Sequence, residues 1–407
     1  MAQKVIAIKI DGTINPASSG YIERGIELAE KENATCLVIS LNTPGGLLKS
    51  TRVIVENMMK SSVPVVVYVS PSGAHAGSAG VFITLAANIA AMAPGTNIGA
   101  AHPVSMQSGG DSTMNEKSTN DAVAFVRTIA EKRARNGQWA ENAVRKSYSI
   151  TETEALNLKV IDLIASGVPD LLKQINGRTV ETTGGTKTIT TSAASVENVE
   201  MSFVEKLLNI LSDPNLAYIL MMIGFYGLLF ELYSPGAIFP GIVGVIALIL
   251  AFYSLHTLPI NYAGLALIIF GIVLFLLEIK IISHGLLAIG GTVALLLGSM
   301  MLIRKIPNME FLRISWGVII PTVVVTVLFF LFVIGAGLRA QRAKPITGVE
   351  GLKDETGLAL ETLNPTGTVL VHGEIWNADA IEGIIEKGKR VRVISIDNLR
   401  LKVELDK

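Results

Sequence analysis

The chain has 407 residues, no formal net charge, one cysteine and five histidines. Half of its residues are hydrophobic, 17% are charged, and the mean hydropathy is +0.50. This length predicts more than one domain, and a soluble α/β protein is seldom so apolar. The balanced charge argues against general affinity for nucleic acid. The single cysteine and scattered histidines argue against a disulfide framework and a zinc site, and we expect no metal and no cofactor.

The chain opens with "MAQKVIAIKIDG", in which no charged and apolar leader precedes the first strand-like run. Because the interior of the sequence is strongly apolar, either the later helices alone insert the protein or a signal peptide has been removed. The dipeptide "AQ" directly before a strand resembles a mature N-terminus, which favours removal of a signal peptide.

Residues 1–170 predict an α/β domain. Two amphipathic stretches at 19–33 and 47–61 predict helices between short apolar runs, and Cys36 is expected to be buried in one of these runs. Apolar runs bounded by Gly, Pro, Asn or Asp are typical of buried parallel strands, and they occur at 4–10, 35–41, 64–70, 86–93 and 160–165. The alternation predicts stacked βαβ units.

The next two segments differ from this domain and from each other. Residues 171–200 are rich in Thr, Gly and Ser, which predicts a small β-hairpin or a linker. Residues 201–215 place apolar side chains on one helical face, which predicts an amphipathic helix on the membrane surface.

Residues 216–338 predict a transmembrane domain. Five apolar stretches approach the roughly 20 residues that a hydrocarbon core requires, at 216–233, 238–255, 261–279, 285–303 and 315–338. The first two are short and joined by Pro-Gly pairs, so a re-entrant hairpin is an alternative and the expected count is four to five spans. The basic run "RAQRAK" at 339–344 favours a cytoplasmic exit of the last span, although basic residues at 304–313 weaken this argument.

Residues 345–407 predict a small all-β unit, because apolar and polar residues alternate between turn signals. About five strands in this length suit an OB-type barrel. Acidic residues slightly outnumber basic ones here, and Trp376 is the only large aromatic residue. We therefore expect a protein-interaction role and no nucleic-acid binding.

Two glycine-bearing turns suggest an acyl-transfer site. In "LNTPGGLL" (41–48) and "GAHAGSAG" (73–80), a strand ends and a helix begins, so free N–H groups can stabilise negative charge. Ser78 lies at the start of the second helix among small neighbours that leave room for a peptide. Either turn alone is more simply a tight strand-to-helix connection with Ser78 as a helix N-cap.

Together, "NTPGG", "GAHAGSAG" and "AMAPGTNIGAAHPV" resemble the crotonase-like serine peptidases of the ClpP and signal peptide peptidase A type. The order of peptidase domain, membrane spans and terminal barrel resembles, over essentially the whole chain, the long-form NfeD membrane-bound serine proteases. The resemblance implies Ser78 as the nucleophile, the N–H groups of Gly46 and Ala79 as the oxyanion hole, and no metal. Gly45, Gly77 and Met106 are the expected substrate groove.

The base that activates Ser78 has two candidates. The resemblance implies a Ser–Lys dyad, and the matching lysine is Lys117; a lysine needs burial or a nearby cation to act as a base. The alternative is His102 in "AAHPV", at nearly the distance seen in ClpP-type Ser–His–Asp triads, with Asp162 as a loose candidate for the third member. The sequence leaves both open.

The resemblance also implies a partner of the stomatin, prohibitin or flotillin type, apolar peptide substrates, contact with lipid, and self-association. It implies an integral protein of a prokaryotic cell membrane, with the peptidase domain extracytoplasmic and the barrel cytoplasmic. The alternative function is a structural partner of stomatin-like assemblies whose peptidase activity is subordinate or latent.

Overall fold

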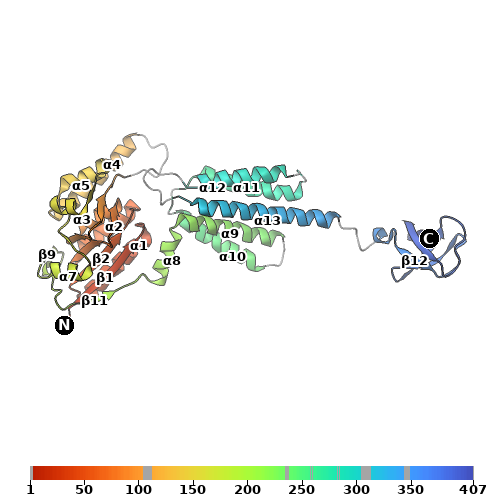
Figure 1. Ribbon diagram of the computed structural model, residues 1–407, viewed down its shortest axis with the longest axis horizontal. Coiled ribbons are helices and arrows are strands. Elements are labelled where there is room, and N and C mark those ends of the chain that lie inside the picture. Colours follow the sequence, from red (N-terminus) through yellow and green to blue (C-terminus); the bar gives the residue numbers. More distant parts are fainter. Residues whose placement is uncertain are drawn as a thin grey trace. The chain divides into compact units, whose positions relative to one another are not determined.

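A computed structural model describes residues 3–103, 112–233, 238–256, 258, 260–281, 283, 285–303, 313–342 and 349–406. The chain divides into two compact units. The first comprises residues 1–277 and 283–327, and the second comprises 278–282 and 328–407. Each unit is described by itself (Figure 1).

A six-stranded sheet in the order β11-β1-β2-β3-β5-β8 forms the centre of the N-terminal domain, and every neighbouring pair in it is parallel. The strands are β1 (Lys4–Asp11), β2 (Cys36–Asn42), β3 (Val65–Val69), β5 (Ile89–Met92), β8 (Leu163–Ile164) and β11 (Ser195–Asn198). The first five coincide with the apolar runs, so the expected α/β fold is confirmed.

The apolar runs are continuous because the central strands are buried on both faces. Along β2, Leu37 and Ile39 enter one hydrophobic core, whereas Cys36 and Val38 enter the other. The larger core is covered by helices α1 (Pro16–Lys31), α2 (Leu48–Lys60), α3 (Ala79–Ala86), α4 (Ser112–Lys132) and α5 (Gly137–Arg145). The smaller core is covered by α7 (Val168–Ile175). Successive side chains along such a strand are therefore buried on opposite faces of the sheet.

A second, three-stranded sheet carries the loops that follow the main strands. It consists of β4 (His75–Gly77), β6 (Asn97–Gly99) and β7 (Ser149–Thr151), and α6 (Glu152–Asn157) follows directly. The pairing of β4 with β6 is parallel and that of β6 with β7 is antiparallel. This small sheet positions the segment before Ser78.

The Thr-, Gly- and Ser-rich segment contains more structure than its composition predicts. Strands β9 (Thr179–Thr182) and β10 (Gly185–Thr188) form an antiparallel hairpin. Beyond it, β11 pairs with β1 and becomes an edge strand of the main sheet. β11 could not be predicted from the sequence, because the side chains of this edge strand are exposed and form no apolar run. The following helix α8 (Phe203–Leu211) matches the expected amphipathic segment.

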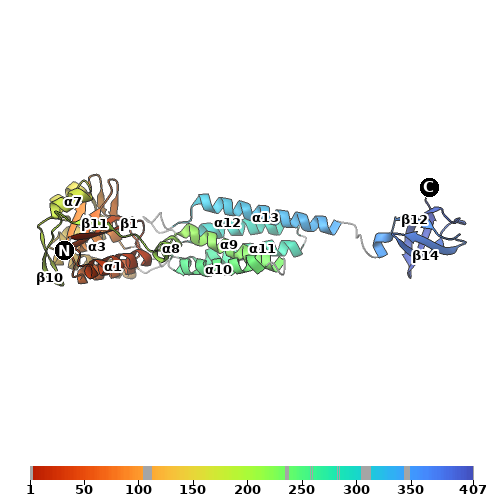
Figure 2. The same cartoon turned by 90° about the horizontal axis from the view of Figure 1, so that it is seen from below.

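Five apolar helices follow: α9 (Pro214–Tyr233), α10 (Ile238–His256), α11 (Tyr262–Lys280), α12 (Leu286–Met301) and α13 (Trp316–Arg342). By length and composition, the stretches Pro214–Glu231 and Ile238–His256 can cross a membrane, and the apolar parts of the other three described helices are shorter. α9 and α10 lie side by side (Figure 2). Glycine permits this approach, because a Cβ on Gly227 would lie 2.7 Å from the Cα of Gly244.

The C-terminal domain is a closed five-stranded barrel in the order β12-β13-β14-β16-β15, as the alternating pattern predicted. After the short 3-10 helix η2 (Val349–Leu352), its strands are β12 (Thr356–Ala359), β13 (Thr366–Val371), β14 (Glu374–Ala380), β15 (Arg390–Asp397) and β16 (Arg400–Leu405). β14 and β16 are parallel and the other neighbours are antiparallel. The barrel has its own hydrophobic core, built around residues such as Val369, Val393 and Leu401.

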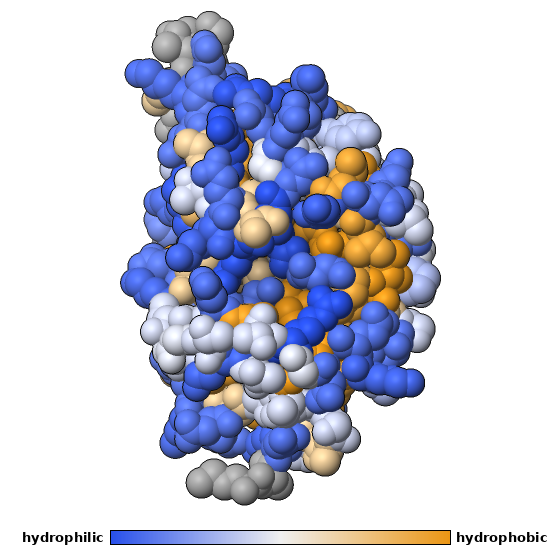
Figure 3. Space-filling view, turned by 90° about the vertical axis from the view of Figure 1, so that its left-hand side faces the viewer, coloured by the Kyte–Doolittle hydropathy of each residue, from blue (hydrophilic) through white to orange (hydrophobic). Residues whose placement is uncertain are grey.

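Hydrophilic residues cover most of the molecular face seen from the side of the N-terminal domain, and hydrophobic residues gather in one area of it (Figure 3). The apolar helices differ, because they expose many large hydrophobic side chains, including Phe239, Ile249 and Phe332. The N-terminal domain therefore has the surface of a water-facing domain, and the helices have the surface of lipid-facing ones.

Burial makes the Cys36 thiol unreactive in the folded protein. Its side chain is fully buried, and this burial raises the pKa of the thiol to about 12. Because the thiolate is the reactive form, we expect no modification of the detergent-solubilised native protein by iodoacetamide at pH 8, and one modified thiol per chain after unfolding in guanidinium. Mass spectrometry measures both, and stoichiometric modification of native protein would contradict the buried placement.

Candidate active site

Ser78 lies in a sharp turn between β4 and α3. Its backbone angles are φ 48° and ψ −105°, a region that costs free energy for any residue with a side chain. The turn is held by two hydrogen bonds, from Ser78 N to the Gly99 carbonyl (3.2 Å) and from Val81 N to the Ser78 carbonyl (3.1 Å). Ser78 occupies the N-cap position of α3, as the simpler interpretation expects, but its side chain makes no capping hydrogen bond with the helix.

The neighbours of Ser78 are small because backbone segments cross closely here. A Cβ on Gly80 would lie 2.9 Å from the Thr43 methyl group, and a Cβ on Gly45 would lie 2.6 Å from the Ser78 Cβ. A strained strand-to-helix turn with small flanking residues is the geometry that presents a serine hydroxyl in nucleophile elbows. The strain at Ser78 is thus typical of a functional position.

The "NTPGG" segment is held from both sides. On one side Thr43 pairs with β4, through bonds from Thr43 N to the His75 carbonyl and from Gly77 N to the Thr43 carbonyl, each 2.9 Å. On the other side Ile14 donates to the Gly45 carbonyl and accepts from Leu47 N, each at 2.8 Å. The Gly45–Gly46 backbone is therefore positioned by β4 and by the segment before α1.

Thr43 shapes this turn from within, and the sequence analysis missed it. Its fully buried hydroxyl accepts from Gly45 N (3.0 Å) and donates to the Gly45 carbonyl (3.1 Å). A threonine two residues before a glycine in a Pro-containing turn is a known local signal for this bonding. The signal was present in "NTPGG" and could have been used.

Two backbone N–H groups next to Ser78 are unpaired. Ala79 is the first residue of α3, where helical geometry supplies no acceptor. At Gly46, the bridge to Ile14 uses the groups of the flanking residues and leaves the Gly46 N–H pointing away. Within the described ranges neither amide, nor the Ser78 hydroxyl, has a hydrogen-bond partner. Such a pair of donors can stabilise an oxyanion.

Ser78, Gly46 and Ala79 line a common cavity of about 440 Å³. Apolar side chains contribute much of its wall, namely Leu47, Leu48, Phe82, Ala101 and Ala122. His102 and Ser118 also line it. Gly45 and Gly77 pack directly behind Ser78 and do not line the cavity, because Gly45 faces the Ser78 side chain and Gly77 faces the Pro44 carbonyl. Met106 lies outside the described residues.

The structure does not bring Lys117 into this cavity. Lys117 is exposed on the second turn of α4, although the next residue, Ser118, and Ala122 line the wall. α4 is held beside α2 by Arg52, whose guanidinium lies 2.5 Å from the Asp121 carboxylate and 4.4 Å from the centroid of the Phe125 ring. Participation of Lys117 would therefore require its side chain to turn inward around a fixed helix.

His102 reaches the cavity, but the triad proposed for it lacks its acid. The His102 Nδ1 lies 2.9 Å from the Val144 carbonyl, so this nitrogen carries the proton and donates it to a neutral acceptor. Asp162 is used elsewhere, since its Oδ2 accepts from Arg135 Nη2 and from Ala90 N, both at 2.7 Å. The hypothesis that Asp162 is the third member is wrong, because that carboxylate fastens Arg135 to the sheet.

Within the part of the chain that the structure describes, no group of three or more His, Cys, Asp or Glu side chains could hold a metal ion. The polar residues that line the cavity are Ser78, Thr51, Ser118, Lys49, His102 and His256, beside the two amide donors, and Lys117 lies on the helix that carries Ser118. This set suits acyl transfer.

Substitution of Gly46 tests the tight contact behind the two amide donors. An added Cβ would lie 2.0 Å from the Ile14 carbonyl oxygen, so Gly46→Ala must push two backbone segments apart. We expect a destabilisation of about 1–3 kcal/mol and loss of activity, measured by thermal unfolding and peptide cleavage. The matched control is Gly20→Ala in α1, where nothing lies within 4 Å of the added atom. Equal behaviour of both variants would contradict this placement.

Three family models match the chain in succession. They are described as the NfeD1b N-terminal domain, matching residues 4–172, the NfeD integral membrane domain, matching 215–336, and the NfeD-like C-terminal, partner-binding domain, matching 349–404.

Two curated relatives match along almost their whole length. The membrane-bound protease PH1510 of Pyrococcus horikoshii is 34% identical over 98% of this chain and 93% of that protein. The membrane protein NfeD1b of Bacillus subtilis is 28% identical over 98% of this chain and 92% of that protein.

Solved structures match single domains. A 1510-N membrane protease specific for a stomatin homologue from Pyrococcus horikoshii is 32% identical and covers 52% of this chain and all of its own, with a TM-score of 0.46. The C-terminal domain of the stomatin operon partner protein 1510-C is 42% identical over 15% of this chain and 97% of its own, with a TM-score of 0.15. On the full-length match to PH1510 and the three family models, the chain belongs to the NfeD family and is a membrane-bound protease.

Proposed function

We propose that the protein is a serine endopeptidase in which Ser78 attacks the peptide carbonyl, the N–H groups of Gly46 and Ala79 bind the oxyanion, and Lys117 transfers the proton. The observation that carries this proposal is the cavity where a strained serine meets two unpaired amide donors. Strain that persists at such a position is a common mark of function.

The proposed reaction has two steps. The neutral Lys117 amine takes the Ser78 hydroxyl proton as Oγ bonds to the carbonyl carbon, and the amide N–H groups stabilise the tetrahedral oxyanion. The intermediate collapses, the C–N bond breaks, and the lysine ammonium gives its proton to the leaving amine. Water then hydrolyses the acyl-enzyme with the same amine as base, which restores the Ser78 hydroxyl and releases the second product.

The choice of Lys117 over His102 rests on what each would need. A histidine base gains from a carboxylate that stabilises the imidazolium, but the His102 Nδ1 faces the Val144 carbonyl and Asp162 is engaged by Arg135. Lys117 must lose its proton, which requires shielding from water. Since Ser118 and Ala122 of the same helix already line the cavity, a bound peptide can cover the Lys117 amine.

The substrates we propose are apolar peptide segments, because Leu47, Leu48 and Phe82 form the cavity wall. The relatives add a candidate source, since one solved relative is described as specific for a stomatin homologue. A stomatin-type membrane protein is therefore the proposed substrate and partner. Self-association, and an extracytoplasmic peptidase domain with a cytoplasmic barrel, stay predictions.

Three substitutions test the dyad in the full chain. Ser78→Ala and Lys117→Ala should each lower kcat by about 10³-fold or more, because they remove members of one catalytic unit. His102→Ala should retain most of the activity and leave the shape of the pH profile unchanged. Cleavage of a fluorogenic apolar peptide measures all three.

The controls separate the possible failures. Lys132→Ala, at the far end of α4, should behave as wild type. Activity that survives Lys117→Ala but disappears in His102→Ala would transfer the base role to His102. Cleavage that survives Ser78→Ala, or a wild-type chain that cleaves nothing, would remove the enzyme proposal for Ser78 and favour the structural-partner alternative.

The barrel is the proposed binding site for the stomatin-type partner. Its family model is described as partner-binding, and seven large apolar side chains are exposed among its described residues. The most exposed are Ile375, Ile384 and Leu399, at 68%, 63% and 70%. Covering side chains of this kind on binding contributes free energy in proportion to the apolar area buried.

Substitution on the barrel surface tests partner binding. Ile384→Ser and Leu399→Ser should each weaken binding of a stomatin-family protein about tenfold, which corresponds to about 1.4 kcal/mol. The measurement is titration of the full chain in detergent, and peptide cleavage should not change. Glu382→Ser, at an exposed position two residues before Ile384, is the control and should bind as wild type. Unchanged binding by both apolar variants would exclude this surface.

A further inference from the structure

Helix α8 has its polar side against the N-terminal domain and its apolar side exposed. Apart from Lys206, the exposed side chains of α8 are apolar, namely Phe203 (81% exposed), Val204, Leu207 and Ile210. Glu205 and Asn209, in contrast, face α1 and are half-buried. A surface helix normally has the opposite arrangement. α8 therefore combines the burial of Leu211 and the partial burial of Leu208 with specific polar contacts to α1.

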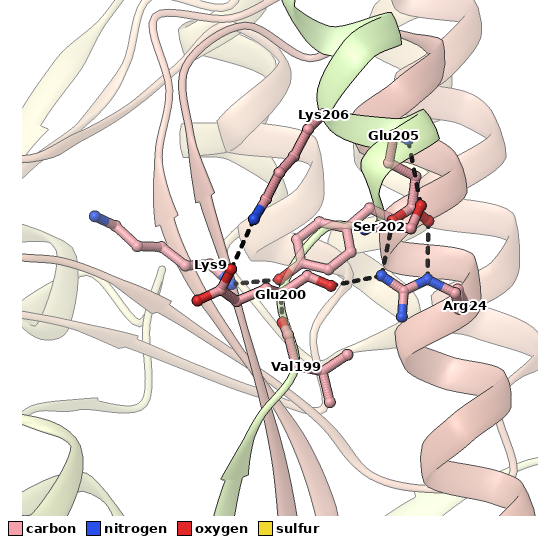
Figure 4. A network of polar contacts seen from close by, with 8 residues as sticks. Lys9, Arg24, Val199, Glu200, Ser202, Glu205 and Lys206 are labelled. Carbon is pink, nitrogen blue, oxygen red and sulfur yellow. Dashed lines mark hydrogen bonds and ion pairs between the residues drawn. The ribbon is translucent and has the colours of Figure 1, made fainter.

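Charged groups fasten the start of α8 to α1 (Figure 4). The Arg24 guanidinium donates to both oxygens of Glu205, at 2.9 and 2.7 Å, and to the Glu200 carbonyl at 2.7 Å. This contact lowers the pKa of the Glu205 carboxyl, because the guanidinium stabilises its charge. Glu205 also completes a capping box with Ser202. The start of α8 is thus held by paired, charge-assisted hydrogen bonds.

One turn later, α8 contacts the segment that holds the oxyanion loop. The Asn15 side-chain amide donates to the Asn209 side-chain oxygen at 2.8 Å. Asn15 is almost fully buried and is also the N-cap of α1, where its oxygen accepts from Ser18 N at 2.9 Å. Both ends of the Asn15 amide are therefore engaged, and its backbone is fixed by α1 and α8 together.

Asn15 directly follows Ile14, which pairs with the backbone on both sides of Gly46. The backbones of Ile14 and Gly46 are in tight contact, since even a Cβ on Gly46 would overlap the Ile14 backbone. A displacement of Ile14 must therefore displace the Gly46 N–H. Three hydrogen bonds, between Asn15 and Asn209, Ile14 and Gly45, and Leu47 and Ile14, together with the Ile14–Asn15 peptide bond, link Asn209 to the residues on either side of this donor.

We propose that α8 positions the oxyanion hole through the Asn209–Asn15 hydrogen bond, so that Asn209 and Asn15 are positioning residues for the reaction at Ser78. This inference rests on the proposed peptidase function and deepens it. α9 begins at Pro214, three residues after the end of α8, so the attachment to the first apolar helix and the geometry of the active site share one element. The apolar outer face of α8 gives this element a lipid-facing side next to the first membrane helix.

The chemistry of the pair allows a test in which size and capping do not change. With aspartate at either position alone, the remaining asparagine can donate its N–H₂ to the carboxylate, and aspartate caps α1 as well as asparagine does. With aspartate at both positions, two acceptors face each other and no hydrogen bond can form. The double variant therefore lacks the hydrogen bond that each single variant can keep, so it reports what the two residues contribute together.

We expect Asn15→Asp and Asn209→Asp to cleave peptide at close to the wild-type rate in the full chain. The double variant, and Asn209→Leu, should lower kcat about tenfold or more with little change in KM, because a misplaced donor weakens the transition state and not substrate binding. A peptide boronate, which forms a tetrahedral anion on the serine, should bind more weakly by the same factor. Lys206→Ala is the matched control. Lys206 lies on α8 and forms an exposed ion pair with Glu200, which precedes the helix, and its removal should change neither kcat nor boronate affinity.

The outcomes are distinguishable from failure of the proposed function. If Ser78→Ala abolishes cleavage but the double Asp variant keeps the wild-type kcat and boronate affinity, the positioning role is wrong and the peptidase proposal stands. A lower melting temperature with unchanged kcat would equally overturn it, because that is the result of a purely structural bond. If Asn209→Leu does not fold, the double variant tests the positioning role by itself. The proposal expects each of its two substitutions to be tolerated when made alone. Cleavage that survives Ser78→Ala removes both proposals.

Discussion

The candidate active site of this protein depends on the backbone pairing of one short segment, Thr43 to Leu47, with two neighbours. Ile14 holds it from one side and β4 from the other, and the Thr43 hydroxyl closes the turn internally. Each of these bonds is ordinary, but together they leave a single N–H group, that of Gly46, without a local acceptor. A donor that is unpaired and immobile is what an oxyanion requires, because no reorganisation is needed when charge develops.

The same pairing explains the strain and the small residues around Ser78. Because the segment lies directly against β4, the chain after β4 must turn sharply to enter α3, and Ser78 takes the strained conformation. Gly45 and Gly80 are glycines because a Cβ at either position would overlap the turn. The buried core of α3, in which all eight residues are buried, stabilises the helix strongly enough to offset this strain.

The sequence predicted the elements whose burial follows a simple pattern. The five main strands were recognised by short continuous apolar runs, the apolar helices by longer ones, and the barrel by its alternation of apolar and polar residues. The edge strand β11 was missed because its side chains are exposed, and the polar contacts of α8 with α1 were missed because they join residues far apart in the chain. Ser78, Gly46 and Ala79 line one cavity, and the roles that the family resemblance implies for them stay predictions. Asp162 was wrongly considered as the third member of a triad, because its pairing with Arg135 is visible only in the fold. The contributions of Thr43, Ile14 and Asn15 were not predicted.

The sequence by itself determined the domain order, the membrane association, the family and the two turns that form the site. These follow from local composition and from residues close together in the chain, where hydrophobic period and glycine content act directly. Only the tertiary structure decided that the Ser78 side chain does not cap its helix, that the Gly46 N–H has no partner among the described residues, and that Asn209 of α8 contacts Asn15, next to Ile14. Asn209 and Asn15 lie 194 residues apart, and a contact at that separation leaves no periodic trace in the sequence.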